Sequence, residues 1–293
     1  MTQPARAISV ETLNAKFAMM FSEETRQHGL ALKLRPSDVV ITPFGKSGTT
    51  WTQQIVHCLR TGGDMDFDDI SRVVPWIENS AALGINLDAE QKASPRAFKS
   101  HLAWGEIPQG GRYIVAIRDP KDALYSLYRF IEGWFFEPGS ISLDDFAREF
   151  FIKDRAYWKH LGSWWPRRDD DDVLLMAFEH MKLDLSGTIG RVADFIDIKL
   201  DDELQRITEE QASLKFMQEH SDRFDDRLMR EMSERVASLP AGSDSAKVRV
   251  GSIGEHVQHL SDNIAAELDD IWQQEISASF GFPDYQALIA SLN

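Results

Sequence analysis

The chain has 293 residues, with 32 lysines and arginines against 47 aspartates and glutamates, a formal net charge of −15. This acidic balance argues against a nucleic-acid partner, which needs an excess of phosphate-neutralising cations. Cys58 is the only cysteine, so an intramolecular disulfide and a cysteine-rich zinc site are both excluded. The N-terminus lacks the apolar stretch of a signal peptide and no apolar run reaches membrane-spanning length, so we expect a cytoplasmic protein without a membrane partner.

Four short apolar segments, each followed by a helical pattern, predict β-strands. They are Val39–Thr42, Arg96–Lys99, Tyr113–Ile117 and Val173–Ala177. Strands that alternate with helices are typical of a parallel sheet with crossover helices. No Pro-rich or Gly/Ser-rich linker divides the chain. We therefore expect an α/β fold, a single domain over residues 1–293 with a central parallel β-sheet flanked by helices.

The segment after the first strand, Pro43-Phe-Gly-Lys-Ser-Gly-Thr-Thr-Trp51, predicts a P-loop-like phosphate-binding turn. Free amides and the helix dipole at a helix start attract an anion, and Lys46 adds a full positive charge. An ATP-binding P-loop needs a glycine at position 40, where Val40 stands, so this turn is too short for one. The alternative is an ordinary strand-to-helix turn with a chance lysine. Three hydroxyl side chains supply further donors: Ser47, Thr49 and Thr50.

The second predicted strand leads into a candidate catalytic pair. If residues 96–101 are extended, Lys99 and His101 share one face, because side chains alternate along a strand. A cation beside a neutral imidazole suits the transfer of an anionic group, with the histidine accepting a proton. Glu255, His256 and His259 do not form a His-Glu-x-x-His zinc pattern, so no metal is expected.

The third predicted strand ends at Arg118, where a second phosphate could bind. Asp119 and Pro120 predict a helix start, with the aspartate as N-cap. Ser126 lies on that helix and could add a hydroxyl donor. Ligands of open parallel sheets bind beyond the carboxyl ends of the strands, where Arg118 and Lys46 both emerge. The alternative is an ion pair between Arg118 and a neighbouring carboxylate, Asp119 or Asp122.

Two further segments are predicted in the C-terminal half. Residues 222–248 read as a helix followed by a mobile loop, and Ile264–Phe280 as an amphipathic helix. Several aromatic residues are candidate walls of an apolar acceptor pocket, with Trp76 and Phe130 the preferred ones. The other candidates are Trp104, Trp134, Phe135 and Phe136.

Taken together, these segments resemble the cytosolic-type sulfotransferase family, including its bacterial small-molecule members, which uses 3′-phosphoadenosine 5′-phosphosulfate (PAPS). Six segments follow the family's order and spacing over nearly the whole chain. They are Lys46-Ser-Gly-Thr-Thr-Trp51, Arg72-Val-Val-Pro-Trp-Ile-Glu78, Pro95-Arg-Ala-Phe-Lys-Ser-His101, Arg118-Asp-Pro-Lys-Asp-Ala-Leu-Tyr-Ser126, Phe178-Glu-His-Met-Lys182 and Arg249-Val-Gly-Ser-Ile-Gly254.

The resemblance implies the sulfotransferase fold and a role for each matched residue. His101 would be the catalytic base, Lys99 would steady the sulfuryl group, and Lys46 would stabilise the leaving phosphate. The 5′-phosphate would be held by the turn, the adenine would lie against two aromatic rings, and the 3′-phosphate would be held by an arginine-rich site. The turn residues are Ser47, Gly48, Thr49 and Thr50, the adenine residues are Trp51 and Phe178, and the 3′-phosphate residues are Arg118, Ser126, Arg249 and Gly251. Ser213 would lie in a turn that contacts the nucleotide.

The implied activity is in-line transfer of a sulfuryl group from PAPS, without a metal, to the hydroxyl or amine of a small hydrophobic acceptor. Four departures from the family pattern, Gly45, Phe178, Ala212 and Val250, predict weaker donor affinity but not loss of activity. Two alternatives stay open: an ATP-dependent small-molecule kinase, and a non-catalytic nucleotide-binding protein on the same fold. The segment Gln258–Glu267 does not match the family's dimer motif, which leaves the oligomeric state open.

Overall fold

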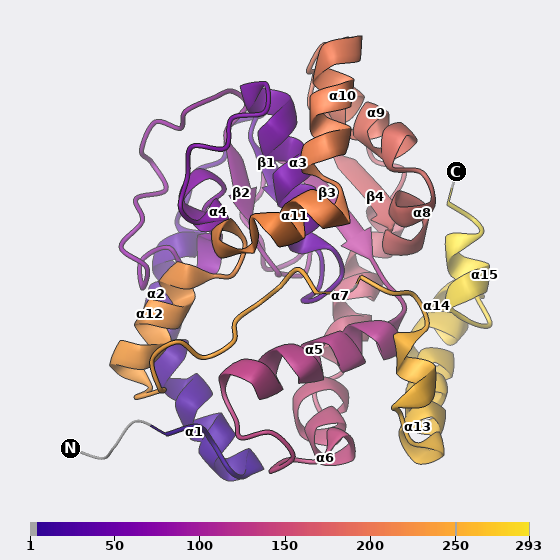
Figure 1. The fold of residues 1–293 in the computed structure, drawn as a ribbon. Helices are drawn as coiled ribbons and strands as arrows, with labels where there is room; N and C mark the ends of the chain where they lie inside the picture. The colour runs from indigo at the N-terminus through magenta and orange to yellow at the C-terminus, as the bar shows by residue number, and fades with distance from the viewer. Residues whose placement is uncertain (1–4, 250, 293) are drawn as a thin grey trace.

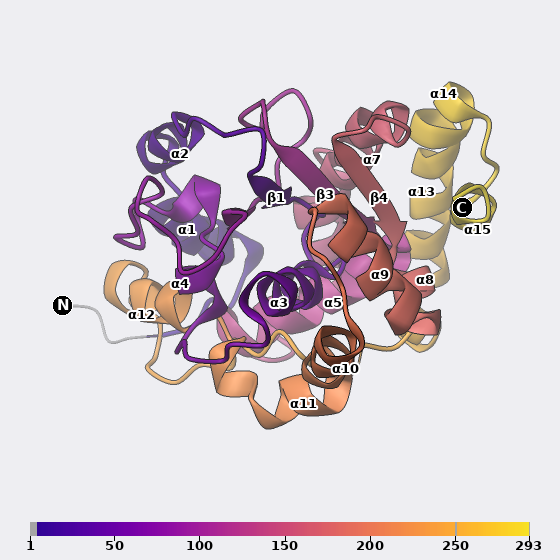
Figure 2. The ribbon, with the colours of Figure 1, turned by 90° about the horizontal axis from the view of Figure 1, so that it is seen from above.

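The computed structural model describes residues 5–249 and 251–292. Its centre is a parallel four-stranded sheet in the order β2-β1-β3-β4, with helices on both sides (Figure 1 and Figure 2). The predicted α/β fold with a parallel sheet is thereby confirmed. All four predicted strands are present to within one residue of their expected bounds: β1 (Val39–Ile41), β2 (Ala97–Lys99), β3 (Arg112–Ile117) and β4 (Val173–Ala177).

Helices make up most of the remaining described chain. The α-helices are α1 (Val10–Met20), α2 (Glu23–Leu30), α3 (Thr49–Thr61), α4 (Ile70–Val73), α5 (Pro120–Trp134), α6 (Leu143–Ala147), α7 (Ala156–Trp164), α8 (Phe178–Leu183), α9 (Leu185–Phe195), α10 (Asp202–Gln211), α11 (Leu214–Glu219), α12 (Arg227–Val236), α13 (Asp262–Trp272), α14 (Ala278–Phe280) and α15 (Tyr285–Ile289). Short 3₁₀ or π turns are η1 (Ile77–Asn79), η2 (Arg148–Ile152), η3 (Trp165–Arg167), η4 (Ser221–Arg223), η5 (Glu255–Gln258) and η6 (Gln273–Ser277). None of the described helices is both long and apolar enough to cross a bilayer.

The two faces of the sheet belong to two separate hydrophobic clusters, because successive side chains on a strand point in opposite directions. Val40 and Val115 pack on one side, in the cluster that contains the buried residues of α5 and α7. Ile41 and Ile114 pack on the other side, in the cluster that contains the buried residues of α3 and α9. Burial on both faces explains why the strands read as continuous apolar runs.

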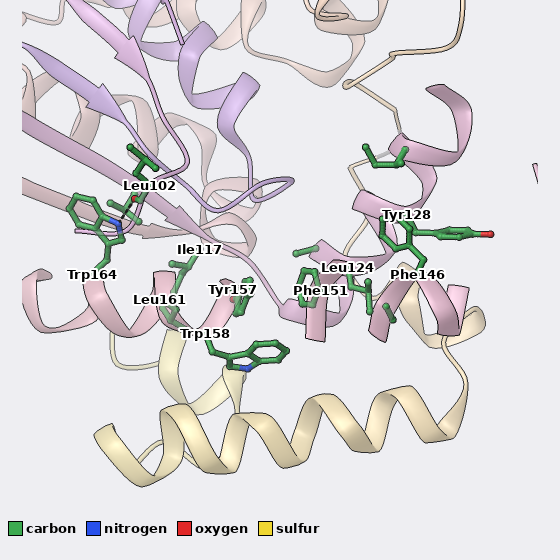
Figure 3. Packing of buried hydrophobic residues seen from close by; sticks show 14 of the residues in the cluster. Leu102, Ile117, Leu124, Tyr128, Phe146, Phe151, Tyr157, Trp158, Leu161 and Trp164 are labelled. Atoms are coloured by element: carbon green, nitrogen blue, oxygen red, sulfur yellow. Dashed lines mark hydrogen bonds between the residues drawn. The ribbon is translucent and has the colours of Figure 1, made fainter. Parts of the chain in front are cut away.

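An aromatic layer beneath α5 and α7 supports the carboxyl end of β3 (Figure 3). Trp164 donates its indole N–H to the carbonyl of Leu102 over 3.2 Å, and the Tyr157 hydroxyl donates to the carbonyl of Arg118 over 2.5 Å. Trp158 and Trp164 are both 1% exposed or less. The backbone at Arg118, directly after β3, is therefore fixed by the core.

The helix start predicted at Asp119 is confirmed. Its carboxylate accepts a hydrogen bond from the backbone N–H of Lys121, and Pro120 occupies the first turn of α5. The predicted amphipathic helix Ile264–Phe280 is also present, as α13 and α14 joined through the π turn η6.

The helix and the loop predicted within residues 222–248 are both present, and the mobility of the loop stays a prediction. The helix, α12, starts only at Arg227 and ends at Val236. The chain after it runs between α11 and α5 across the molecule (Figure 1) and is tied down by specific contacts. The Ser245 hydroxyl donates to the carbonyl of Asp225 over 2.5 Å, and Arg230 donates to the same hydroxyl over 3.1 Å.

Candidate active site

The turn between β1 and α3 leaves polar groups free for an anion. Gly48, with φ 96°, precedes α3, and no side chain caps the first amides of that helix. The hydroxyls of Ser47 and Thr49 are buried and have no hydrogen-bond partner among the described residues. Unpaired amides and hydroxyls at a helix start are the groups that bind phosphate and sulfate oxygens.

A glycine is required at position 48. A Cβ there would lie 3.1 Å from the ring of Phe178, and the backbone is left-handed, which disfavours any other residue. Lys46 is also left-handed, with φ 67°, so the turn bends sharply on both sides of Ser47. This bend presents the lysine and the start of α3 to the same space.

Two lysines pack against aromatic rings at the carboxyl ends of β1 and β2, Lys99 buried and Lys46 half-buried. The Lys46 Nζ lies 4.1 Å from the ring centroid of Phe130, and the Lys99 Nζ lies 3.8 Å from that of Trp76. Burial, aided by the positive charge of Lys247, lowers the pKa of each lysine to about 7. Neither lysine forms an ion pair with a carboxylate in the part of the chain that the structure describes, so both are placed to receive an anion.

His101 is held in one tautomer by the backbone. Its Nδ1 lies 2.7 Å from the carbonyl oxygen of Pro43, and its own backbone N–H donates to Glu78 over 2.8 Å. A carbonyl oxygen only accepts, so Nδ1 carries the proton and Nε2 keeps a free lone pair. Burial, together with the charge of Lys99, lowers the pKa of His101 to about 3. The imidazole is therefore neutral at pH 7 and able to accept a proton.

These residues share one cavity of about 750 Å³. Of the predicted site residues, all but Ser47 line it, and Ser47 is buried beneath the turn. The cavity residues predicted from the sequence are Lys46, Gly48, Thr49, Thr50, Trp51, Trp76, Lys99, His101, Arg118, Ser126, Phe130, Phe178, Ser213, Arg249 and Gly251. Among the described side chains, no group of three or more His, Cys, Asp or Glu is arranged to hold a metal ion.

Arg118 connects the phosphate turn to the loop that follows α12. Its guanidinium donates to the carbonyl of Lys46 over 3.1 Å and to that of Ser252 over 2.9 Å. Its Nε is buried and has no partner among the described residues. The alternative ion pair with Asp119 or Asp122 is not formed in the described chain. Arg118 therefore forms no ion pair beside the cavity, although the Asp122 carboxylate is near enough for the two charges to interact.

The loop after α12 is anchored to the cavity rim through its backbone. Gln218 donates to the carbonyl of Arg249, and Lys182 donates to that of Gly251. Further along, the Asp122 carboxylate accepts the backbone N–H of Gly254 over 2.7 Å. The side chain of Arg249 lines the cavity from this loop. Val250, one of the predicted departures, lies outside the described residues.

Two aromatic rings line the cavity next to Arg118, whose guanidinium carbon lies 4.6 Å from the ring centroid of Phe178. The rings of Trp51 and Phe178 lie 5.7 Å apart at 69°, and the Trp51 indole N–H donates to the carbonyl of Ala212 over 2.8 Å. Ser213 lines the cavity, but its hydroxyl already donates to the carbonyl of Glu210 over 2.7 Å and caps α11. This part of the cavity offers flat apolar surface for a planar ring.

The aromatic acceptor walls were only partly identified from the sequence. Trp76, Phe130, Trp134 and Phe135 line the cavity, whereas Trp104 and Phe136 do not. Trp104 packs on Trp164 with centroids 5.2 Å apart, and Phe136 is fully buried in the core. Further apolar lining residues were missed, among them Phe17, Phe21, Phe146, Phe150 and Met229. They come from α1, the chain after it, α6, η2 and α12, which no local pattern links to the site.

Charged lining residues were also missed, and two of them form a pair. Asp226, the residue before α12, and Lys247, on the loop after it, form an ion pair within the cavity. The only signal available from the sequence is a lysine placed two residues before Arg249.

Comparison with known proteins identifies the family. The sulfotransferase domain model matches residues 36–280. Rabbit (Oryctolagus cuniculus) amine sulfotransferase is 27% identical over 83% of this chain and 82% of its own, and firefly (Photinus pyralis) luciferin sulfotransferase is 26% identical over 89% and 76%. A mouse sulfotransferase complexed with PAP has the same fold, with 19% identity, a TM-score of 0.65 and coverage of 89% and 91%. The chain therefore belongs to the sulfotransferase family and is an enzyme of that type.

Proposed function

We propose that the protein transfers a sulfuryl group from PAPS to a hydroxyl or amine of a small, hydrophobic acceptor. One observation carries the proposal: a neutral histidine with a free Nε2 lines the same cavity as Lys46 and Lys99, which have no ion-pair partner in the described chain. This set matches the needs of anionic group transfer, which are a proton acceptor for the nucleophile and cations for the charge that develops.

The chemistry of the cavity fits the donor, which supplies an activated sulfuryl group and two anionic ends. At one end stand Lys46 and the uncapped start of α3, with the unpaired hydroxyl of Thr49. The other end is lined by Arg118, whose Nε has no hydrogen-bond partner among the described residues, and by Arg249 and Ser126. Between them, Trp51 and Phe178 supply the apolar surface that an adenine needs. Two solved relatives were crystallised with PAP, the product of such a donor.

Each catalytic side chain has a definite task in the proposed reaction. His101 accepts the acceptor's proton at Nε2 as the new S–O or S–N bond forms. Lys46 and the amides of the turn stabilise the 5′-phosphate oxygen, which keeps the electron pair of the broken S–O bond. Lys99 binds the oxygens of the sulfuryl group while that group is transferred. Donors arranged in advance for such charge are worth roughly 10²–10³ in rate each.

The remaining walls indicate an aromatic or aliphatic acceptor. Beyond His101 the cavity is lined by Trp76, Phe130, Phe146, Phe150 and Met229. These side chains favour an apolar molecule that presents one hydroxyl or amine to the polar end. Relatives with this domain include an amine sulfotransferase and a luciferin sulfotransferase, both named for small-molecule acceptors.

We also propose that residues 1–293 form one sulfotransferase domain, extending beyond the matched region at both ends. Before it, the Ala7 backbone N–H donates to the carbonyl of Phe135 over 2.8 Å, and Phe17 and Phe21 line the cavity. After it, the Tyr285 hydroxyl donates to Glu179 over 2.5 Å. Both flanks therefore take part in the same core.

The experiment uses PAPS labelled in its sulfuryl group and a panel of phenols, alcohols and amines. We expect mass spectrometry to find at least one acceptor that gains the labelled sulfate, with the Phe130→Ala variant changing which acceptors react. A protein that binds ATP with magnesium more tightly than PAP, and transfers phosphate, would be a kinase instead. A protein that binds PAP and transfers nothing to any member of the panel would contradict the proposed function.

A further inference from the structure

The ion pair of Asp226 and Lys247 stands inside the reaction cavity, although no predicted motif contains it. The side chains of Asp226 and Lys247 are 5% and 9% exposed. Both line the cavity that also holds Lys46, Lys99 and His101. The pair joins the start of α12 to the loop that leads to Arg249, two segments that are 21 positions apart in the sequence.

Lys247 lies close to both of the other lysines. After burial itself, its positive charge is the strongest influence that lowers the pKa of Lys46 and of Lys99. On the other side of the pair, burial opposes ionisation of Asp226, but the charges of Lys247, Lys99 and Lys46 hold its pKa below the usual value. One carboxylate therefore sits among three converging ammonium groups.

Neither Lys46 nor Lys99 forms an ion pair in the described chain, although the charge of Asp226 acts on both lysines and that of Glu78 acts on Lys99. Buried ion pairs seldom stabilise a fold more than apolar residues of the same volume, because both ions lose their hydration. The Lys247 ammonium has three N–H donors, and Asp226 is the one carboxylate that pairs with it in the described chain. The Lys247 ammonium group therefore keeps N–H donors that can bind a second acceptor at the point where the sulfuryl group is transferred.

Building on the proposed function, we propose that Lys247 is a third catalytic cation, which binds the oxygens of the sulfuryl group together with Lys99, and that Asp226 positions it. The S–O bond to the 5′-phosphate breaks and the bond to the acceptor forms while Lys247 holds the non-reacting oxygens. The proton still goes from the acceptor to His101. Asp226 contacts neither substrate and acts through the orientation of the lysine.

PAP lacks the sulfuryl group, and this difference separates a catalytic role from a structural one. For Lys247→Met, which keeps length but removes charge, we expect kcat to fall about 10²-fold while the Kd for PAP stays within about twofold. Lys247→Arg should restore part of the loss because the charge is kept. Lys215→Met, a change at a lysine that is 86% exposed on α11, is the matched control and should leave both constants unchanged.

Asp226 is tested by a double-mutant cycle. Asp226→Asn alone should lower kcat about tenfold, and the double variant should be no slower than Lys247→Met, because the carboxylate acts only through the lysine. Full activity of Lys247→Met, or a PAP affinity that falls as much as kcat, would overturn the proposal. Additive losses in the double variant would overturn the positioning role. An unmodified protein that transfers no sulfuryl group would instead contradict the proposed function itself.

Discussion

Raising the pH should weaken PAPS binding, because Lys46 must be charged to hold the 5′-phosphate and Lys99 must be charged to hold the sulfuryl group. Burial lowers the pKa of Lys46 and Lys99 to about 7 in the free protein. At about pH 8 each lysine is then roughly 90% neutral. A bound anion favours the charged form and raises both pKa values, so binding takes up protons.

The size of the pH effect on affinity follows from the number of lysines that take up a proton on binding. Between about pH 8 and 9, binding should take up between one and two protons, and the affinity for PAPS should fall by roughly tenfold per pH unit for each proton taken up. The 3′-phosphate of PAPS is already fully ionised in this window, since its second pKa is near 6. The slope therefore reports the lysines alone.

Calorimetry measures this uptake directly when PAPS is titrated, without an acceptor, in buffers that differ in ionisation enthalpy. Lys99→Met should remove about one of the protons taken up, because one titrating amine is lost. An affinity that does not change from pH 7.5 to 9, or a release of protons on binding, would show that the two lysines are not the charged groups that receive the donor.

Three further outcomes are expected. His101→Ala should lower kcat by about 10²–10⁴ while PAP affinity changes less than twofold, and lost binding in calorimetry would point to a structural role. Arg118→Ala should weaken PAP at least tenfold, because its guanidinium is the charged group at the carboxyl end of β3, and an unchanged Kd would contradict the assignment of the 3′-phosphate site. The free energy of unfolding of the free protein should increase as the pH rises from about 7 to 10. The reason is that folding lowers the pKa of Lys46 and Lys99, so the unfolded chain binds more protons than the folded protein. A free energy of unfolding, measured in urea, that falls over this pH range would contradict the lowered pKa of the two lysines.

The sheet could be predicted from the sequence because each strand is buried on both faces. Such strands read as unbroken apolar runs, and all four were located to within one residue. The start of α5 was equally readable, since Asp119 and Pro120 are a cap and a first-turn residue of strong local preference. These features depend only on residues that are adjacent in the chain, so they can be predicted from the sequence.

The candidate site was predictable where it follows a strand or opens a helix. Lys46, Lys99 and Arg118 come directly at or after β1, β2 and β3, and parallel strands bring their carboxyl ends to one edge. The tautomer of His101 was not predictable, because it depends on the carbonyl of Pro43 from a different strand end.

The acceptor side was poorly predictable because it is assembled from distant segments. Phe17 reaches the cavity from α1, although nothing in its local pattern distinguishes it from a core residue. Trp104 and Phe136 are errors of the opposite kind: they were predicted as pocket walls because they are aromatic, but they pack in the core. Lys247 was missed for the same reason: its partner, Asp226, is brought near only by the path of the chain after α12.

The most direct test of the central claim follows the label from PAPS in the unmodified protein and in His101→Ala, with PAP binding measured on both. We predict labelled, sulfated acceptor from the unmodified protein alone, together with nearly equal PAP affinity for the two proteins. Equal transfer by both proteins, or transfer by neither, would contradict a reaction in which the free Nε2 of His101 accepts the acceptor's proton.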